Sequence, residues 1–363
     1  MERPPSPAPA RDTDHASGPL PAVRPSPRDD GDPMSETGRT RAHDDLAVRR
    51  VPVSFELFPP RSDAAAIALG RTIDKLAEAA PAFISVTFGA GGSTHDRSLT
   101  VLRYILDQTT VEPMAHLTCV GSSHEEANHL VREFLDAGIT SFLALRGDPP
   151  KDSDGDGLGD LGSSAELVQL IHRVQQEREP FAQLGVPGAP KARRIEDRPR
   201  PERVAVATFP TGHPRSANRR QDVDALLAKE VAGANLAITQ LFWHADDYLR
   251  FVELAREGGV TIPILPGIMP VVSPKRLARL TELTGVPAPD DLAIALEIEP
   301  DEAAQREIGM RFATDLARAV LDGGAPGLHL YTFNRHEAVL GVLAELDLYP
   351  PRAARPTSLT EHA

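Results

Sequence analysis

The chain has 363 residues, a formal net charge of -13 and a hydrophobic content of 41%, which suffices for one large domain with a buried core. The acidic balance argues against nucleic-acid binding, and the single cysteine, Cys119, excludes an internal disulfide and a multi-cysteine metal site. No apolar run approaches the roughly 18 residues of a membrane span, and no secretory signal is recognisable, so we expect a cytoplasmic protein without membrane partners.

Composition divides the chain into a domain and two tails. Residues 1–45 are rich in Pro, Arg, Asp and Ser without aliphatic periodicity, which predicts a disordered tail. Residues 46–350 are expected to form the globular domain, and residues 351–363 a short C-terminal tail. Within the domain, residues 183–202 combine prolines, glycines and arginines and predict an exposed loop insertion. Phosphate binding by its arginines is the alternative to a solvated loop.

Short apolar runs alternate with amphipathic stretches through the domain. Eight runs predict strands, at residues 52–56, 82–88, 114–119, 141–146, 203–209, 236–241, 262–266 and 327–332. Apolar residues at helical spacing predict helices at 164–178, after a capping box of Ser163 and Glu166, and at 221–233, 246–257 and 311–322. Eight strand–helix units over roughly 300 residues predict an α/β fold, the (β/α)8 TIM barrel. A doubly wound sheet is the alternative, but it would leave two strands unused.

The first predicted strand ends at Glu56, between Phe55, Leu57, Phe58 and two prolines. Such apolar surroundings raise the pKa of a carboxyl group by desolvation, which suits a general acid near neutral pH. The alternative is a carboxylate that caps the next helix or pairs with Arg61.

The fourth predicted strand ends in Arg146, Gly147 and Asp148, which two prolines follow. A charged pair at the end of a buried strand, with a glycine that lets another group approach, is typical of barrel active sites. Asp148 is therefore a candidate functional carboxylate, and a simple salt bridge or turn residue is the alternative.

Three further strand ends carry candidate ligand-binding groups. The glycine-rich turn at residues 89–92 follows Thr87 and could cradle an anion, although its spacing is not that of a phosphate loop, and a tight turn is the alternative. Alternation places His116 in the barrel interior, where a core histidine is the default. His213 lies in a turn rich in proline and glycine, where a ligand contact is more plausible.

An acidic loop follows the fourth strand and matches several positions of a calcium-binding loop, at Asp152, Asp154, Asp156, Gly157 and Asp160. Ser163 stands where a bidentate glutamate is required, and a strand rather than a helix precedes the loop. We therefore expect no metal site there.

Taken in order, these segments resemble the 5,10-methylenetetrahydrofolate reductase family in its short bacterial form, which has the catalytic barrel alone. The matching motifs lie at residues 54–60, 86–93, 116–119, 144–149, 209–214, 229–235, 238–240, 266–270 and 331–335. Each motif is modest, but nine in the same order are specific.

The resemblance implies an oxidoreductase that reduces 5,10-methylenetetrahydrofolate to 5-methyltetrahydrofolate in one-carbon metabolism and methionine supply. NADH or NADPH would be the electron donor, acting through non-covalently bound FAD with ping-pong kinetics, and the protein would be a homo-oligomer. Glu56 would open the folate ring by protonating N10, and Asp148 would lie beside the flavin ring and stabilise a cationic folate iminium.

The same resemblance assigns the binding residues. FAD would contact Thr87, His116, Leu145, Arg146, Gly147, Asp148, His213, Asp222 and Lys229, with Arg146 and Lys229 at its phosphates. Gln240 and Arg335 would join Glu56 at the substrate. The chain departs from the family pattern at Phe88, Phe209, Thr211 and Pro274, which bears on FAD affinity. Flavin-independent hydride transfer from NADH and a non-catalytic barrel that binds folate or flavin are the alternatives.

Overall fold

A computed structural model describes residues 51–88, 92–118, 121–147, 159–178 and 202–349, all of which lie in the compact unit of residues 49–363. Several sequence predictions fall outside the described residues: the two tails, the start of the glycine-rich turn, Cys119, Asp148, the calcium-like loop up to residue 158, and all of the 183–202 insertion except Glu202.

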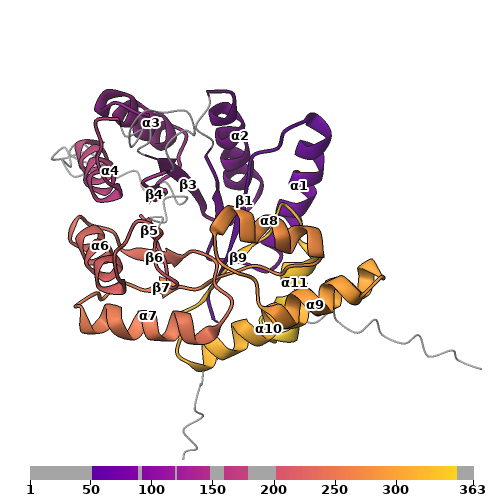
Figure 1. The fold of residues 1–363 in the computed structure, drawn as a ribbon. Coiled ribbons are helices and arrows are strands. Elements are labelled where there is room, and N and C mark those ends of the chain that lie inside the picture. The colour runs from indigo at the N-terminus through magenta and orange to yellow at the C-terminus, as the bar shows by residue number, and fades with distance from the viewer. Residues whose placement is uncertain (1–50, 89–91, 119–120, 148–158, 179–201, 350–363) are drawn as a thin grey trace, which may run out of the picture. The chain divides into compact units, whose positions relative to one another are not determined.

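Nine strands among the described residues pair in one all-parallel sheet in the order β7-β6-β5-β4-β3-β2-β1-β9-β8. Their bounds are β1 (Val53–Leu57), β2 (Phe83–Val86), β3 (Pro113–Thr118), β4 (Ser141–Leu145), β5 (Val204–Thr208), β6 (Leu236–Thr239), β7 (Ile264–Leu265), β8 (Gly267–Ile268) and β9 (Leu328–Tyr331). Only Pro266 separates β7 from β8, so the two form one extended run that closes the sheet into an eight-stranded barrel (Figure 1). The predicted (β/α)8 barrel is confirmed.

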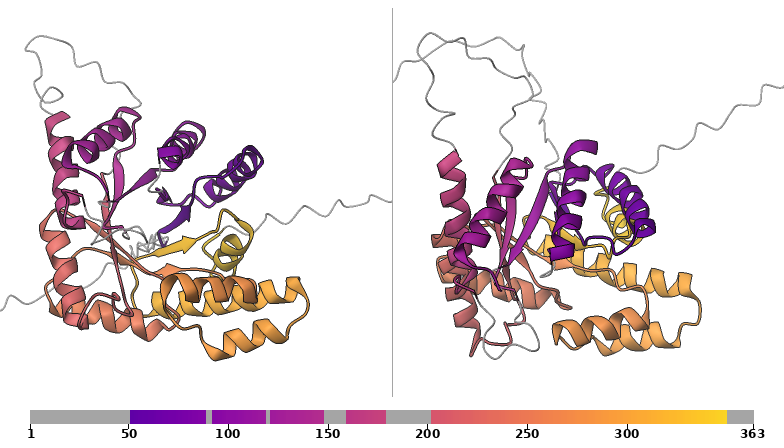
Figure 2. Two further views of the ribbon diagram at one scale, coloured as in Figure 1. Left: turned by 45° about the horizontal axis from the view of Figure 1, so that its top comes forward. Right: turned by 90° about the horizontal axis from the view of Figure 1, so that it is seen from above.

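Helices surround the barrel (Figure 2). Their bounds are α1 (Asp63–Ala77), α2 (Gly92–Gln108), α3 (His124–Asp136), α4 (Ser164–Arg178), α6 (Arg219–Val231), α7 (Ala245–Glu257), α8 (Pro274–Thr284), α9 (Asp290–Ile298), α10 (Glu302–Asp322) and α11 (Glu337–Glu345). The predictions at 164–178, 221–233 and 246–257 are confirmed as α4, α6 and α7. The prediction at 311–322 is only the second half of α10, because Asp301 caps that helix earlier by accepting from Ala304 N at 2.9 Å.

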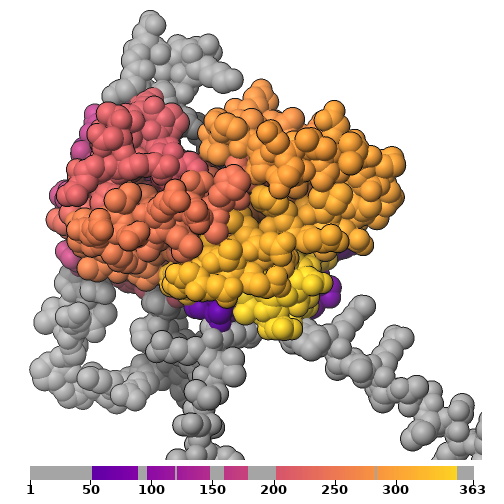
Figure 3. Space-filling view, turned by 60° about the horizontal axis from the view of Figure 1, so that its bottom comes forward, coloured from indigo at the N-terminus to yellow at the C-terminus, as the bar shows by residue number. Residues whose placement is uncertain are grey.

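The connection from β8 to β9 carries three helices, α8, α9 and α10, where the alternation predicted one. They pack around an apolar cluster that includes Trp243, Val271, Leu277, Leu280, Leu292 and Leu296. In the space-filling view, this part of the chain forms a continuous block, orange to yellow (Figure 3). The additional helices thus add a helical layer to one side of the barrel, between β8 and β9 in the chain.

Alternation along the strands sorts the barrel residues into two sets. Outward residues such as Phe55, Ile84 and Phe142 belong to the main core beneath the helices. The other set forms a separate apolar cluster that comprises Phe83, Met114, Leu143, Ala205, Leu236, Ile238 and Leu265. β1 and β9 interrupt this apolar lining with Ser54, Glu56 and His329, so polar groups enter the barrel from these two strands. None of the described helices is long and apolar enough to cross a membrane.

Candidate active site

The predicted site residues gather at the carboxyl ends of the strands. Glu56 is on β1, His116 is on β3, and Leu145 ends β4 directly before Arg146 and Gly147. Thr87, Gln240 and Arg335 follow β2, β6 and β9, whereas His213 precedes α6 and both Asp222 and Lys229 lie on that helix. Because all strands are parallel, their carboxyl ends share one mouth. The structure therefore brings the predicted residues to one end of the barrel, apart from Asp148, which it does not describe.

Glu56 lies between two buried histidines. Its Oε2 atom is 3.7 Å from Nε2 of His116 on β3 and 3.7 Å from Nε2 of His329 on β9. The glutamate side chain keeps 22% of its surface exposed, while the two imidazoles are 5% and 0% exposed. Neither Nε2 atom has a hydrogen-bond partner among the described residues. This cluster of one carboxyl and two imidazoles can hold a proton and move it towards the mouth.

The prediction that the apolar surroundings raise the pKa of Glu56 is wrong. Burial raises its pKa, but contact with His329 and the charges of both histidines lower it more, so the net pKa lies below the usual value of a glutamate. The pKa of His116 is lowered by burial and by His329, against the opposing effect of Glu56. Glu56 is therefore ionised near neutral pH unless a neighbouring group supplies a proton.

His329 and Tyr331 are site residues that the sequence analysis did not single out. The Tyr331 hydroxyl donates to the Thr239 carbonyl at 2.8 Å, and burial followed by the charge of Glu56 raises its pKa well above the ordinary value. Gly267 of β8 fits beneath this bond, where a Cβ atom would lie 2.3 Å from the same carbonyl oxygen. The signal in the sequence was the alternation of β9, which puts His329 and Tyr331 on one face.

A second cluster forms where the β5 end meets α6. Lys229 Nζ donates to the Ala207 carbonyl at 2.8 Å. Asp222 Oδ1 accepts from Ser216 Oγ at 2.5 Å and from the backbone N–H of His213 at 3.3 Å. The second carboxyl oxygen, Oδ2, is buried and has no hydrogen-bond partner among the residues that the structure describes. The cluster therefore presents an unpaired acceptor beside a partly buried cation.

Cations and the Asp222 carboxylate act together in this second cluster, and Asp222 has the largest charge effect on His213. Burial lowers the pKa of Lys229 to about 8, although Asp222 opposes the shift. The pKa of His213 is lowered by burial and further by the charges of Arg215, Lys229 and Arg146, against the effect of Asp222. Three cations therefore lie close enough to act on one imidazole ring, which makes this end of the barrel a suitable place for a phosphate group.

The remaining predicted contacts lie around these clusters. Thr87 is fixed by its backbone, which donates to the Leu57 carbonyl at 2.9 Å. Gln240 accepts from the N–H of Leu241 at 2.8 Å and keeps its amide nitrogen without a recorded partner in the described part of the chain. Both side chains remain partly exposed and are therefore accessible from the mouth.

Arg335 is exposed after β9 and has a neighbour that the sequence analysis missed. Arg276 of α8 lies over the Phe333 ring, with its guanidinium carbon 4.3 Å from the ring centroid. Burial and the charge of Arg335 lower the pKa of Arg276. Neither arginine forms an ion pair with any described residue, so this rim of the barrel carries two cations available to an anionic group.

The departures from the family pattern have structural roles. Phe88 packs edge-on against Phe134 with 6.5 Å between ring centroids. Phe209 packs edge-on against His213 at 4.6 Å, directly beside the second cluster. Pro274 is the first residue of α8, where its missing N–H costs nothing. These positions supply packing rather than hydroxyl groups.

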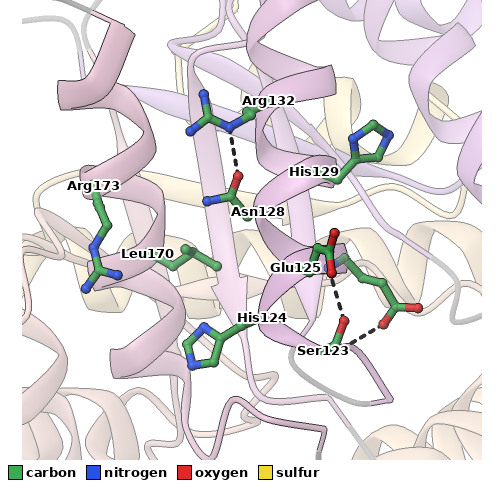
Figure 4. Close-up of a pocket in the computed structure, with 9 residues that line it drawn as sticks. Ser123, His124, Glu125, Asn128, His129, Arg132, Leu170 and Arg173 are labelled. Carbon is green, nitrogen blue, oxygen red and sulfur yellow. Dashed lines mark hydrogen bonds between the residues drawn. The ribbon is translucent and has the colours of Figure 1, made fainter.

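A cleft of about 900 Å³ lies between α3 and α4 (Figure 4). Its lining comes from the segment 123–132 of α3 and its N-cap, together with Leu170 and Arg173 of α4. Arg132 Nε donates to Asn128 Oδ1 within it at 2.7 Å. None of the predicted site residues contributes to its lining.

Comparison with known proteins gives a consistent picture. A family model described as methylenetetrahydrofolate reductase matches residues 41–347. The 5,10-methylenetetrahydrofolate reductase of Escherichia coli (strain K12) is 31% identical over 302 residues, which cover 83% of this chain and 92% of that protein. The methylenetetrahydrofolate reductase (NADH) 1 of Zea mays is 33% identical over 300 residues, which cover 82% of this chain and 49% of that protein. The chain thus spans about half the length of this plant relative.

Among solved structures, an uncharacterized protein from Clostridium thermocellum that binds two copies of 5-methyl-5,6,7,8-tetrahydrofolic acid is similar in fold. The TM-score is 0.53 at 12% identity, covering 82% of this chain and 95% of that chain. At this identity the likeness supports the barrel fold alone.

Proposed function

The chain belongs to the methylenetetrahydrofolate reductase family, and from this premise we propose that it reduces 5,10-methylenetetrahydrofolate to 5-methyltetrahydrofolate with NADH or NADPH. The observation that carries the proposal is the position of Glu56, partly exposed at the barrel mouth and 3.7 Å from each of two buried histidines. Opening the five-membered ring of the substrate requires a proton on N10, and a carboxyl group flanked by imidazoles can deliver one. Glu56 is the proposed acid.

The second cluster fits FAD as the cofactor. Lys229 and Arg146 would bind its phosphates, and the unpaired Oδ2 of Asp222 would accept a hydrogen bond from a hydroxyl group of the cofactor. Thr87, His116, Leu145, Gly147 and His213 are the further proposed contacts. Gly147 has a φ of 80°, a left-handed conformation that favours glycine and leaves the backbone open to close approach. When bound, FAD would carry hydride from NAD(P)H to the folate in two halves at one site, giving ping-pong kinetics.

The folate would contact residues from four strand ends. Gln240 would hydrogen-bond the pterin through its side-chain amide, and Arg335 would bind the substrate at the rim. Asp148 would stabilise the positive charge that develops on the folate when its ring opens, because a fixed carboxylate near a cation lowers its energy. The exposed part of Glu56 would face N10.

Direct hydride transfer from NADH without flavin is the second candidate. The observation that favours it is that Phe88 and Phe209, which depart from the family pattern, pack on neighbouring rings and offer no hydroxyl group to a flavin. A non-catalytic folate-binding barrel is the third, and the proton-bearing cluster around Glu56 counts against it, since binding alone does not require two buried imidazoles beside a carboxyl group.

A visible spectrum of the purified protein, followed by anaerobic titration with NADH and then NADPH, separates these candidates. We expect a yellow protein whose visible flavin absorption is lost on addition of the preferred donor. A colourless protein that converts the folate without stimulation by FAD would instead establish direct transfer. Light scattering after gel filtration would test the expected homo-oligomer, and cell fractionation the expected cytoplasmic location.

A further inference from the structure

Ser54, His329 and Glu56 form a continuous series of polar contacts inside the barrel. Ser54 and Glu56 face the same side of β1, and Ser54 is paired with His329 across β1 and β9. Ser54 Oγ lies 2.8 Å from His329 Nδ1, and His329 Nε2 lies 3.7 Å from Glu56 Oε2. Ser54 and His329 are buried, with 1% and 0% of their surface exposed. Water can therefore reach this series through Glu56.

The hydroxyl of Ser54 determines which nitrogen of His329 exchanges its proton. Ser54 Oγ donates to the Leu328 carbonyl at 3.2 Å. A hydroxyl has a single proton, so its oxygen accepts in the contact with the imidazole and Nδ1 of His329 is the donor. The other ring nitrogen, Nε2, faces the carboxyl group of Glu56.

A proton source of this kind answers a requirement of the proposed reaction. The two histidines keep Glu56 ionised near neutral pH, yet the reaction needs a proton on its carboxyl group. A carboxylate and an imidazolium that share one proton meet both conditions, because either partner can hold it.

We propose that His329, oriented by Ser54, is a positioning residue that loads Glu56 with the proton it delivers to the folate. This inference rests on the proposed function. The Nε2–H bond of the imidazolium breaks as an O–H bond forms on Glu56. Glu56 then gives this proton to N10 while the bond between N10 and the methylene carbon breaks, and the electron pair of that bond stays on nitrogen. Neutral His329 and the Glu56 carboxylate remain, and a proton from water restores the pair.

His116 is less suited to this role despite the same 3.7 Å distance to Glu56. Its Nε2 atom has no hydrogen-bond partner among the described residues, and no hydroxyl group is seen to orient its ring as Ser54 orients that of His329. Burial and the charge of His329 also lower its pKa, which favours the neutral ring. Tyr331, the other titratable group that acts on this cluster, has its pKa raised well above the ordinary value by burial and Glu56, and it keeps its proton.

The dependence of folate reduction on pH tests the proposal. We expect His329→Gln to lower kcat at pH 7 by roughly tenfold to a hundredfold. The fall in activity at high pH should also begin at lower pH, because Glu56 would then have to hold the proton unaided. Ser54→Ala should lower kcat at pH 7 and the pH at which activity begins to fall, but less than His329→Gln does. Ser54→Thr, which keeps the hydroxyl, should restore kcat and this pH.

Ser85→Ala is the matched control for Ser54→Ala. Ser85 is equally buried on the neighbouring strand, and its hydroxyl donates to the Phe55 carbonyl at 3.4 Å, a backbone carbonyl as in the bond from Ser54 to Leu328. Oxidation of NAD(P)H by an artificial acceptor, which needs no proton from Glu56, should be unchanged in all variants. A lower kcat in His329→Gln with an unchanged pH profile would overturn the proposal, as would equal effects of Ser85→Ala and Ser54→Ala.

A second measurement does not depend on activity. In the full chain labelled with ¹⁵N-histidine, the signals absent from His329→Gln identify His329, and its nitrogen shifts report the tautomer. We expect the neutral ring to carry its proton on Nδ1 in the native protein and to lose this preference in Ser54→Ala. A native protein with the proton on Nε2 would refute the proposal. Failure of the native protein to reduce the folate would refute the proposed function, and the tautomer would still be measured.

Discussion

Replacement of Lys229 by methionine should stabilise the flavin-free protein while weakening cofactor binding. Lys229 has its pKa lowered to about 8 from 10.5, mainly by burial. Below pH 8 this difference corresponds to about 3 kcal/mol of destabilisation, since the folded state holds a charge that the unfolded state solvates better. Loss of the hydrogen bond to the Ala207 carbonyl should cost about 1 kcal/mol. We therefore expect Lys229→Met to raise the free energy of unfolding at pH 7 by about 1–2 kcal/mol.

Urea unfolding of the flavin-free proteins between pH 7 and pH 10 measures this effect. Because the folded pKa is lower than the unfolded one, the unfolded state binds more protons between about pH 8 and 10.5, and the native protein gains stability with rising pH in that window. The advantage of Lys229→Met should shrink accordingly. Lys229→Arg keeps the buried charge and should show no gain, and Lys275→Met, at an exposed position of α8, should change little. A Lys229→Met protein less stable than the native one at pH 7, or a difference that does not vary with pH, would refute this reasoning.

Four further substitutions test the structure around the site. Asn334 has a φ of 59°, and its side chain forms hydrogen bonds with both backbone groups of Phe58, at 2.9 and 2.8 Å. Asn334→Ala should therefore lower the free energy of unfolding in urea by about 2–3 kcal/mol. An unchanged free energy of unfolding would contradict a stabilising role of these two hydrogen bonds. Gly267→Ala should lower the free energy of unfolding, measured by thermal unfolding, by more than about 3 kcal/mol, because its Cβ would lie 2.3 Å from a backbone oxygen of β6. In the same assay, Gly70→Ala in α1 should raise the free energy of unfolding by about 0.5–1 kcal/mol. Glu56→Gln should reduce folate turnover by about a hundredfold or more and leave NAD(P)H oxidation by an artificial acceptor intact; unchanged turnover would exclude the acid role.

The sequence predicted the barrel well because its strands are local features. Continuous apolar runs mark strands buried on both sides, and all eight were found near their observed bounds. Helices α8 and α9 were missed because the expected alternation has one helix between consecutive strands, and their apolar residues pack on a satellite cluster rather than on the barrel.

The chemistry of the site was only partly predictable. Glu56 and Lys229 stood in recognisable motifs, but nothing in the sequence singled out His329, and its contact with Ser54 spans 275 positions of the chain. The lowered pKa of Glu56 likewise depends on β1 lying beside β9 and near β3, which local patterns do not reveal.

The most direct test of the central proposal follows the hydrogen that is transferred. The protein is incubated with NADH deuterated at its transferable position, the folate is added afterwards, and the 5-methyltetrahydrofolate formed is analysed by mass spectrometry. Transfer through FAD predicts a product that has lost most of the deuterium, because hydrogen held on the flavin exchanges with water before the folate arrives. A product that retains the deuterium would contradict the flavin-mediated mechanism, and absence of the product would contradict the proposed activity.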